Sequence, residues 1–170
     1  MNGSRSLLLE DDHATGPEAA PTVLVQYGDY ECPFCHRDQP GLERLLAQEG
    51  ARVRFAFRHF PLTAEHPNAE RAARAAEAAD LQGRFWPMHE QLMQHPSPLD
   101  DPGLTACAEA AGLSLERLWE DIERSDVARR VERDVELGRR DGVSGTPWYL
   151  LDGVPSGPLP ALASELRGHG

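Results

Sequence analysis

Two cysteines stand where an expected strand meets an expected helix, and this junction narrows the possible folds more than any other part of the sequence. The strand is the nearly continuous β-prone run at residues 23–27, which is typical of a central strand covered on both faces. Pro33 suits the first position of a helix, where its missing N–H would have no partner, and leucines continue with helical spacing up to Gly50. The pattern therefore predicts Cys32 at the N-cap of this helix and Cys35 one turn further along.

The next segments predict a strand followed by a long helical stretch. Residues 53–60 alternate for part of their length and are rich in aromatic side chains, as in a strand. Strand, helix and strand together form a right-handed βαβ unit. From residue 67 to about residue 140 the pattern is helical: alanines at 64–79 mark the first of five expected helices, and Asp101-Pro102 is the expected cap of the third.

The two ends of the chain differ in character. After the helical stretch, a strand is expected at residues 148–151, then a two-residue hairpin turn at Asp152-Gly153 and a short helix at 159–167. Residues 1–21 are polar and rich in Gly, Ala and Pro without periodicity. They are expected to be a flexible lead-in, with ordered structure beginning near Thr22.

The charged residues exclude several kinds of partner and chemistry. The sequence has 17 basic and 28 acidic side chains, a formal net charge of −11 with neutral histidines, and every basic residue is an arginine. Without lysine, neither a Walker A phosphate site nor a Schiff-base mechanism is available. The excess negative charge repels phosphate backbones and anionic lipid, so neither nucleic acid nor a membrane is an expected partner.

The first 22 residues indicate in which cellular compartment the protein is expected. Their one short apolar run, Leu7 to Leu9, is followed at once by three acidic residues, which a secretory signal or a membrane span would not tolerate. We therefore expect a cytoplasmic protein. A periplasmic or other extracytoplasmic location stays open for a mature chain that begins with a new methionine.

The C-x-x-C spacing at a helix N-terminus is typical of thiol–disulfide chemistry. The thiolate is the nucleophile, and free N–H groups at a helix N-terminus lower the pKa of such a cysteine from about 8.5 to roughly 3.5–7.5. Cys32 is expected to be exposed and to attack, and Cys35 to resolve the mixed disulfide. Half of a zinc site or an ordinary buried pair is the alternative, but the sequence has no second C-x-x-C and no H-x3-H pair.

Several segments together resemble the DsbA-like branch of the thioredoxin superfamily, over about residues 12–157. The segments that carry the resemblance are Asp29–Cys35, Phe57–Leu62, the alanine-rich helix, Phe85–His89 and Gly142–Pro147. The resemblance implies an α/β thioredoxin fold with a helical domain inserted between the second and third core strands. The thioredoxin-fold domain would then comprise residues 22–65 and 141–170, and the inserted helical domain residues 66–140, after a flexible segment at 1–21.

The resemblance also implies how substrates bind. The Thr146-Pro147 peptide bond would be cis, with Pro147 facing Cys32 and the backbone of Thr146 pairing with an extended substrate chain. Neither a bound cofactor nor a metal is implied. The expected partners are protein or peptide thiols and disulfides, together with a reductant or oxidant of unknown identity.

The chain departs from this family in two places beside the cysteines. Relatives usually carry a buried acid six residues before the first cysteine, where this chain has Gln26, and an amide cannot accept a proton from the second cysteine. Strongly oxidising relatives carry histidine between the cysteines, where this chain has Phe34. We therefore expect weaker oxidising power than that of the periplasmic oxidases. His36 would support the thiolate only if it leaned towards Cys32, and Cys107 is expected to be a buried structural thiol.

The sequence thus predicts an enzyme, a protein-disulfide oxidoreductase whose direction as oxidase, reductase or isomerase is open. Two readings from other classes stay open. One is a chaperone-like or metal-binding module that uses the same groove without redox chemistry. The other is a glutathione-dependent isomerase or transferase on the same fold, although such relatives usually lack the second cysteine, here Cys35.

Overall fold

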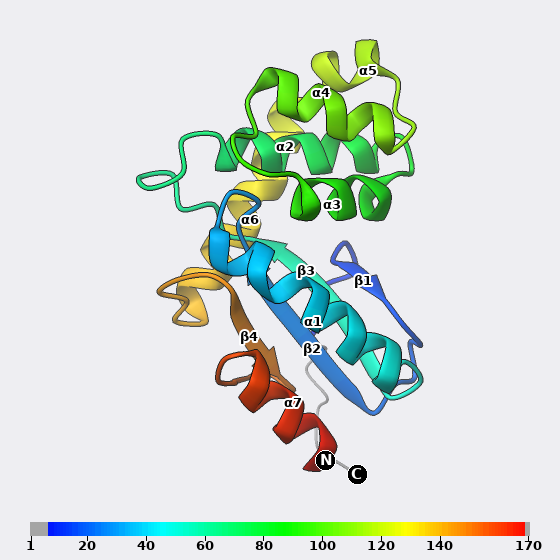
Figure 1. Cartoon of the computed structure of the whole chain (residues 1–170), viewed down its shortest axis with the longest axis vertical. Coiled ribbons are helices and arrows are strands. Elements are labelled where there is room, and N and C mark those ends of the chain that lie inside the picture. Colours follow the sequence, from blue (N-terminus) through cyan, green and yellow to red (C-terminus); the bar gives the residue numbers. More distant parts are fainter. Residues whose placement is uncertain (1–6, 169–170) are drawn as a thin grey trace.

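The chain folds around one five-stranded mixed sheet in a computed structural model that describes residues 7–168. The strand order is β1-β3-β2-β4-β5 (Figure 1). The two central strands, β2 (Thr22–Gly28) and β3 (Val53–His59), run parallel and are joined by helix α1 (Pro33–Glu49), which confirms the expected βαβ unit. The remaining neighbours pair antiparallel: β1 (His13–Thr15) with β3, β4 (Trp148–Leu151) with β2, and β5 (Val154–Pro155) with β4.

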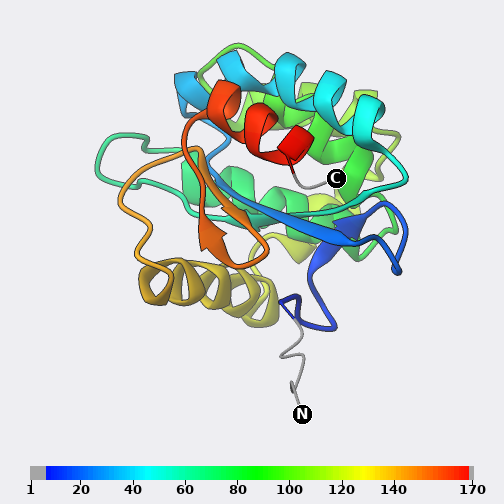
Figure 2. The ribbon, with the colours of Figure 1, turned by 90° about the horizontal axis from the view of Figure 1, so that it is seen from below.

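Helices cover both faces of this sheet. Helix α1 and the last helix, α7 (Leu159–Gly168), lie side by side on one face, and α6 (Ser125–Arg140) passes under the other (Figure 2). Both central strands are therefore enclosed, which is why their apolar residues form nearly continuous runs instead of alternating. This arrangement, with its helical insertion, is the expected thioredoxin fold.

The insertion between β3 and β4 consists of five helices. Four of them gather beyond one end of the sheet (Figure 1), and these are α2 (Ala69–Asp80), α3 (Phe85–Gln94), α4 (Asp101–Ala110) and α5 (Leu115–Asp121). The fifth, α6, leads back under the sheet. One apolar core runs from the sheet through the buried alanines of α2 into this group, so the insertion and the sheet share their packing.

Three sequence-based expectations need correction. Ordered structure begins before Thr22: β1 pairs with β3, and Arg58 Nη2 lies 2.7 Å from Asp12 Oδ2 in a buried ion pair that ties this segment to the sheet. Residues 1–6, which the expected flexible lead-in also includes, lie outside the described part of the chain. Helix α2 begins at Ala69 rather than near residue 64, and Asp100, not Asp101, caps α4 by accepting the Gly103 N–H.

The turn between β4 and β5 confirms the predicted hairpin. Asp152 and Gly153 both have positive φ, 50° and 81°, as a two-residue turn of this hand requires.

Two predictions about the insertion are also confirmed. Ser114 caps α5 by accepting the N–H of Arg117, and Cys107 is buried in α4.

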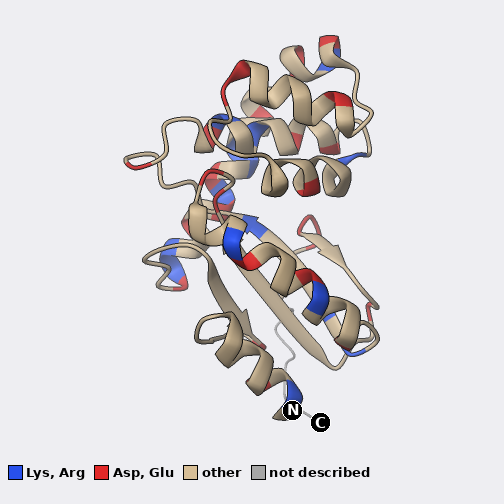
Figure 3. Cartoon of the chain, in the orientation of Figure 1, with Lys and Arg blue, Asp and Glu red and all other residues tan. Residues whose placement is uncertain are grey.

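Charged side chains of both signs are interleaved on the insertion and on α6 (Figure 3). Along α6, Arg130 pairs with Asp134 and Arg140 with Glu136 at i,i+4 spacing. Within residues 7–168, no helix is both long enough and apolar enough to cross a membrane.

Candidate active site

The junction of β2 and α1 holds the two cysteines as expected. Cys32 is the N-cap residue, with extended backbone (φ −73°, ψ 119°), and α1 begins at Pro33. The loop before them is held by Asp29, whose carboxylate accepts the N–H groups of Glu31 and Leu62 at 2.7 and 2.8 Å. These contacts fix the loop that leads into Cys32.

The environment shifts the two thiol pKa values in opposite directions. The Cys35 thiol donates to Cys32, and this contact, helped by the N–H groups of Phe34 and Cys35, lowers the pKa of Cys32 to about 5 against the opposing effect of burial. The same contact with Cys32, together with burial and the Cys32 charge, raises the pKa of Cys35 far above its ordinary value. Cys32 is therefore a thiolate at neutral pH, while Cys35 stays protonated.

Cys32 is less accessible than the sequence suggests. Its residue surface is only 2% exposed, because the loop that precedes β4 lies against it, with the Thr146 carbonyl oxygen 3.4 Å from its sulfur. The expectation of an exposed Cys32 is therefore wrong. Phe34, by contrast, is 54% exposed, and the guanidinium of Arg37 lies 5.1 Å from the centre of its ring.

The covering loop has the backbone expected from the resemblance. The Thr146-Pro147 peptide bond is cis. Thr146 is buried, and its hydroxyl finds no hydrogen-bond partner among the described residues. Its carbonyl and hydroxyl thus lie in the immediate surroundings of Cys32.

Three buried polar residues, Gln26, Asp38 and Tyr149, are linked to the surroundings of Cys35 by strand register and charge. Gln26 is fully buried, and its Cα pairs with that of Tyr149 across β2 and β4. The polar atoms of both side chains are without hydrogen-bond partners in the described part of the chain. Burial, with the nearby charges of Asp38 and Cys35, raises the pKa of Tyr149 far above its ordinary value. The sequence analysis identified Gln26 as a residue near the cysteines, but it missed Tyr149 and Asp38.

The missed residues have weak sequence signals. Asp38 lies three residues after Cys35 on α1, so helical spacing alone places both on one side of the helix. Tyr149 follows Pro147 by two residues and reads as an ordinary core aromatic. Only the β2–β4 register brings it to Gln26.

Two other candidates are placed away from catalysis. The Nε2–H of His36 donates to the carbonyl oxygen of Tyr30, so the ring is anchored to the loop before the cysteines and does not lean towards Cys32. Cys107 is 2% exposed, as predicted, and burial raises the pKa of its thiol to about 11.

Comparisons with a family model and with solved structures point to the same family. The DSBA-like thioredoxin domain matches residues 23–167. A thioredoxin-like oxidoreductase from Silicibacter pomeroyi superimposes with a TM-score of 0.82 at 26% identity, covering 94% of this chain and 93% of its own. BdbD from Bacillus subtilis has the same fold, with a TM-score of 0.80 at 21% identity over 92% and 91% of the two chains.

The curated relatives are longer proteins. The Na(+)/H(+) antiporter NhaA 3 of Salinispora tropica is 42% identical over 142 residues, which cover 84% of this chain and 22% of the antiporter. NhaA 1 of Mycolicibacterium vanbaalenii is 40% identical over 159 residues, 92% of this chain and 26% of its own length. The chain thus spans about a quarter of the curated relatives it matches. The domain match covers nearly all of the described residues, and the chain belongs to the DsbA-like thioredoxin family.

Proposed function

We propose that this chain is a thiol–disulfide oxidoreductase that exchanges disulfides with protein or peptide thiols through Cys32 and Cys35. The observation that carries the proposal is the placement of the pair, with Cys32 at the N-cap of α1 and Cys35 buried one turn further along. The two pKa values agree with this placement, because that of Cys32 is lowered to about 5 and that of Cys35 is raised. One group is ready to attack, and the other holds its proton until a mixed disulfide has formed. Ordinary buried cysteine pairs have no need of such a difference.

The exchange balances in two steps. In reduction, the Cys32 thiolate attacks one sulfur of a substrate disulfide, and the other sulfur leaves as a thiolate that takes up a proton. Cys35 then loses its proton and attacks the Cys32 sulfur, so the second substrate sulfur leaves and a Cys32–Cys35 disulfide remains. Two electrons pass from the pair to the substrate. Oxidation of a substrate dithiol is the same sequence in reverse.

We assign substrate contact to the loop that covers Cys32. Thr146 lies against the Cys32 sulfur, and an extended peptide that pairs with the Thr146 backbone would bring its own sulfur to the same place. Pro147 follows Thr146 in the same loop and would face the bound peptide beside it. The exposed ring of Phe34 offers an apolar contact beside the attacked sulfur.

The pKa of Cys32 leads us to expect an intermediate redox potential. Strong oxidants of this type owe a potential near about −120 mV to a strongly stabilised thiolate with a pKa of about 3.5, whereas thioredoxin, with a pKa of about 7, has about −270 mV. The pKa of about 5 for Cys32 lies between these cases. We expect the potential of the pair to lie between them as well, because Phe34 adds no charge to stabilise the thiolate further.

Turnover and trapping test the proposal together. The purified protein should reduce insulin disulfides in the presence of a dithiol reductant, and Cys35→Ser should accumulate mixed disulfides through Cys32, since the second attack is missing. Cys32→Ser is the matched control and should trap nothing. A wild-type protein that carries zinc on its two thiols and shows no turnover would instead establish the metal-binding alternative. Equal trapping by both serine variants would reverse the assigned roles.

A further inference from the structure

A second group of buried polar residues lies at the opposite edge of the sheet from β4. His13 comes from β1, His59 ends β3, and Glu77 lies on α2; all three are at least nine-tenths buried. Glu77 Oε1 lies 2.7 Å from His13 Nε2 and 2.7 Å from His59 Nε2. The His13 ring also stacks on Phe85, with ring centres 3.5 Å apart, so its orientation is fixed.

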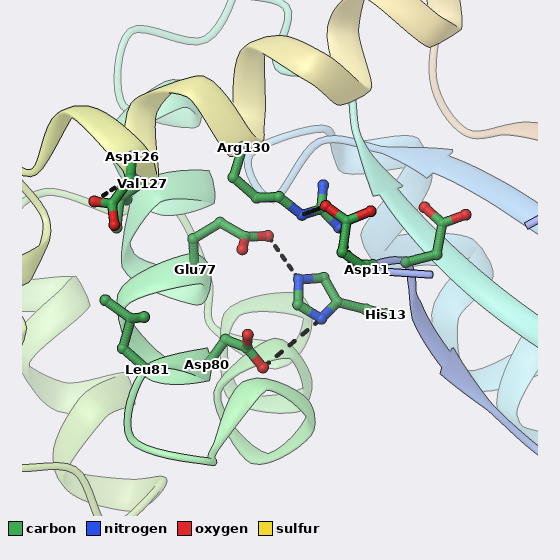
Figure 4. Close-up of a pocket in the computed structure, with 9 residues that line it drawn as sticks. Asp11, His13, Glu77, Asp80, Leu81, Asp126, Val127 and Arg130 are labelled. Carbon is green, nitrogen blue, oxygen red and sulfur yellow. Dashed lines mark hydrogen bonds and ion pairs between the residues drawn. The ribbon is translucent and has the colours of Figure 1, made fainter. Parts of the chain in front are cut away.

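The two imidazoles of this group face the same carboxylate oxygen. His13 Nε2 and His59 Nε2 both lie 2.7 Å from Glu77 Oε1. The other ring nitrogen of His13, Nδ1, lies 3.9 Å from Asp80 Oδ1 (Figure 4). Two buried imidazole nitrogens and one carboxylate oxygen thus converge, with a second carboxylate behind one of the rings.

A cavity reaches two of these residues, His13 and Glu77. It has a volume of about 410 Å³, and its lining also includes Asp11, Asp80, Asp126 and Arg130 (Figure 4). The positive charge of Arg130 is already compensated, because its guanidinium lies 2.7 Å from the buried carboxylate of Asp134. The carboxylates of Asp11 and Asp126 are compensated in turn by Arg133 and Arg124. Asp80, which faces His13, is therefore the lining carboxylate that favours a cation at this end of the cavity.

We propose that His13, His59 and Glu77 form a binding site for a divalent ion of the zinc type. Two imidazoles and one carboxylate are a ligand set that Zn²⁺ accepts, with water from the cavity as the fourth ligand. Asp80 would accept the Nδ1–H of His13, which leaves Nε2 free for the ion. At a tetrahedral ion with ligands at about 2.0–2.1 Å, neighbouring ligand atoms are about 3.3 Å apart, so the present 2.7 Å contacts would open by about 0.6 Å.

Binding here would join three elements that are far apart in the sequence. His13 and Glu77 are 64 residues apart, and His59 and Glu77 are 18 residues apart. The ion would clamp the edge strand β1 and the end of β3 to the first helix of the insertion. It would therefore stabilise the folded chain, since the unfolded chain does not preform the site.

Zinc binding tests the site directly, with Zn²⁺ alone as the probe. The tag-free full chain, carrying Cys32→Ser and Cys35→Ser to remove the thiol pair, should bind one Zn²⁺ in equilibrium dialysis and melt at a higher temperature when saturated. In this background His13→Gln and Glu77→Gln should each weaken binding by more than about tenfold, and Asp80→Asn by about tenfold as expected for loss of an outer partner. His95→Gln, which changes a histidine outside the group, is the matched control and should bind as tightly as its parent.

Co²⁺ distinguishes this site from thiolate ligation. Its complex should show visible bands without the near-ultraviolet thiolate charge-transfer band that ligation by Cys107 would produce. Should Glu77→Gln fail to fold, His13→Gln remains informative because it alters only a three-residue edge strand. No binding at micromolar Zn²⁺, equal affinity in the parent and the His13 variant, or a thiolate band would each overturn the assignment.

Discussion

The carbonyl oxygen of Thr146 lies 3.4 Å from the sulfur of Cys32, although 114 residues separate them in the chain. The contact covers the reactive sulfur with the same loop that we assign to substrate binding. A substrate peptide must therefore replace a contact that the free enzyme already makes.

The low pKa of Cys32 should depend on Cys35. The apparent pKa from the pH dependence of iodoacetamide alkylation should be near 5 in the wild type, because the Cys35 thiol donates to the thiolate. Cys35→Ala removes the donor and should raise the value, whereas Cys35→Ser keeps an O–H and should raise it less. Cys107→Ala serves as the distant control. An unshifted value of about 8.5 in the wild type would contradict the mechanism.

Stability of the reduced protein should rise with pH. The pKa of Cys32 is about 5 in the folded state and about 8.5 in the unfolded state, so the unfolded chain binds more protons between these values. The free energy of unfolding gained from the thiolate is complete only above the unfolded pKa and is lost as the pH falls through about 5.

Urea unfolding of the reduced protein measures this effect. The difference in unfolding free energy between wild type and Cys32→Ser should grow in favour of the wild type from pH 5 to about pH 8. Above about pH 8.5 the raised pKa of Cys35 acts in the opposite direction in the wild type, since only the unfolded thiol then ionises. A difference that stays constant with pH would show that Cys32 is not stabilised as a thiolate.

Resolution of the mixed disulfide should be the slow, pH-dependent step. Cys35 must lose its proton before it can attack, and Gln26 cannot accept it. Gln26→Glu should speed release of the partner near neutral pH, while the buried carboxylate lowers the stability of the fold. Rapid-mixing kinetics from about pH 6 to pH 9 compare the two proteins across the range in which a carboxylate would act.

Tyr149→Phe is the companion variant for the same step. It removes a buried hydroxyl that has no hydrogen-bond partner among the described residues, yet lies near Asp38 and Cys35. Slower resolution in Tyr149→Phe would show that this hydroxyl already helps to carry the proton. An unchanged rate in a folded Gln26→Glu protein would mean that residue 26 does not serve Cys35.

Cys107 should be dispensable for turnover. Its thiol is buried in α4, and its pKa is raised to about 11. Cys107→Ala should leave insulin reduction within about twofold of the wild type and lower the unfolding free energy by about 1 kcal/mol through a small cavity. A large loss of activity with normal stability would instead make Cys107 a redox participant.

The parts of the structure that sequence predicted are those set by local chemistry. Pro33 and the following leucines define the start of α1, and Asp152-Gly153 defines a turn, because each acts through its own backbone preferences. The short strand β1 was missed because its few residues have no periodicity and are held by pairing with β3. Likewise Tyr149 reaches Gln26 only through strand register, which no local pattern encodes.

The insertion also sets the order in which the two parts of the active site are synthesised. Cys32 and the whole of α1 are synthesised before the loop at Thr146, which follows 114 residues later. At about 5–20 residues per second, roughly 6–23 s pass between the two during translation of this chain. A nascent chain on the ribosome therefore carries the nucleophilic cysteine before the segment that screens it exists, and premature disulfides with neighbouring chains are a hazard during that interval.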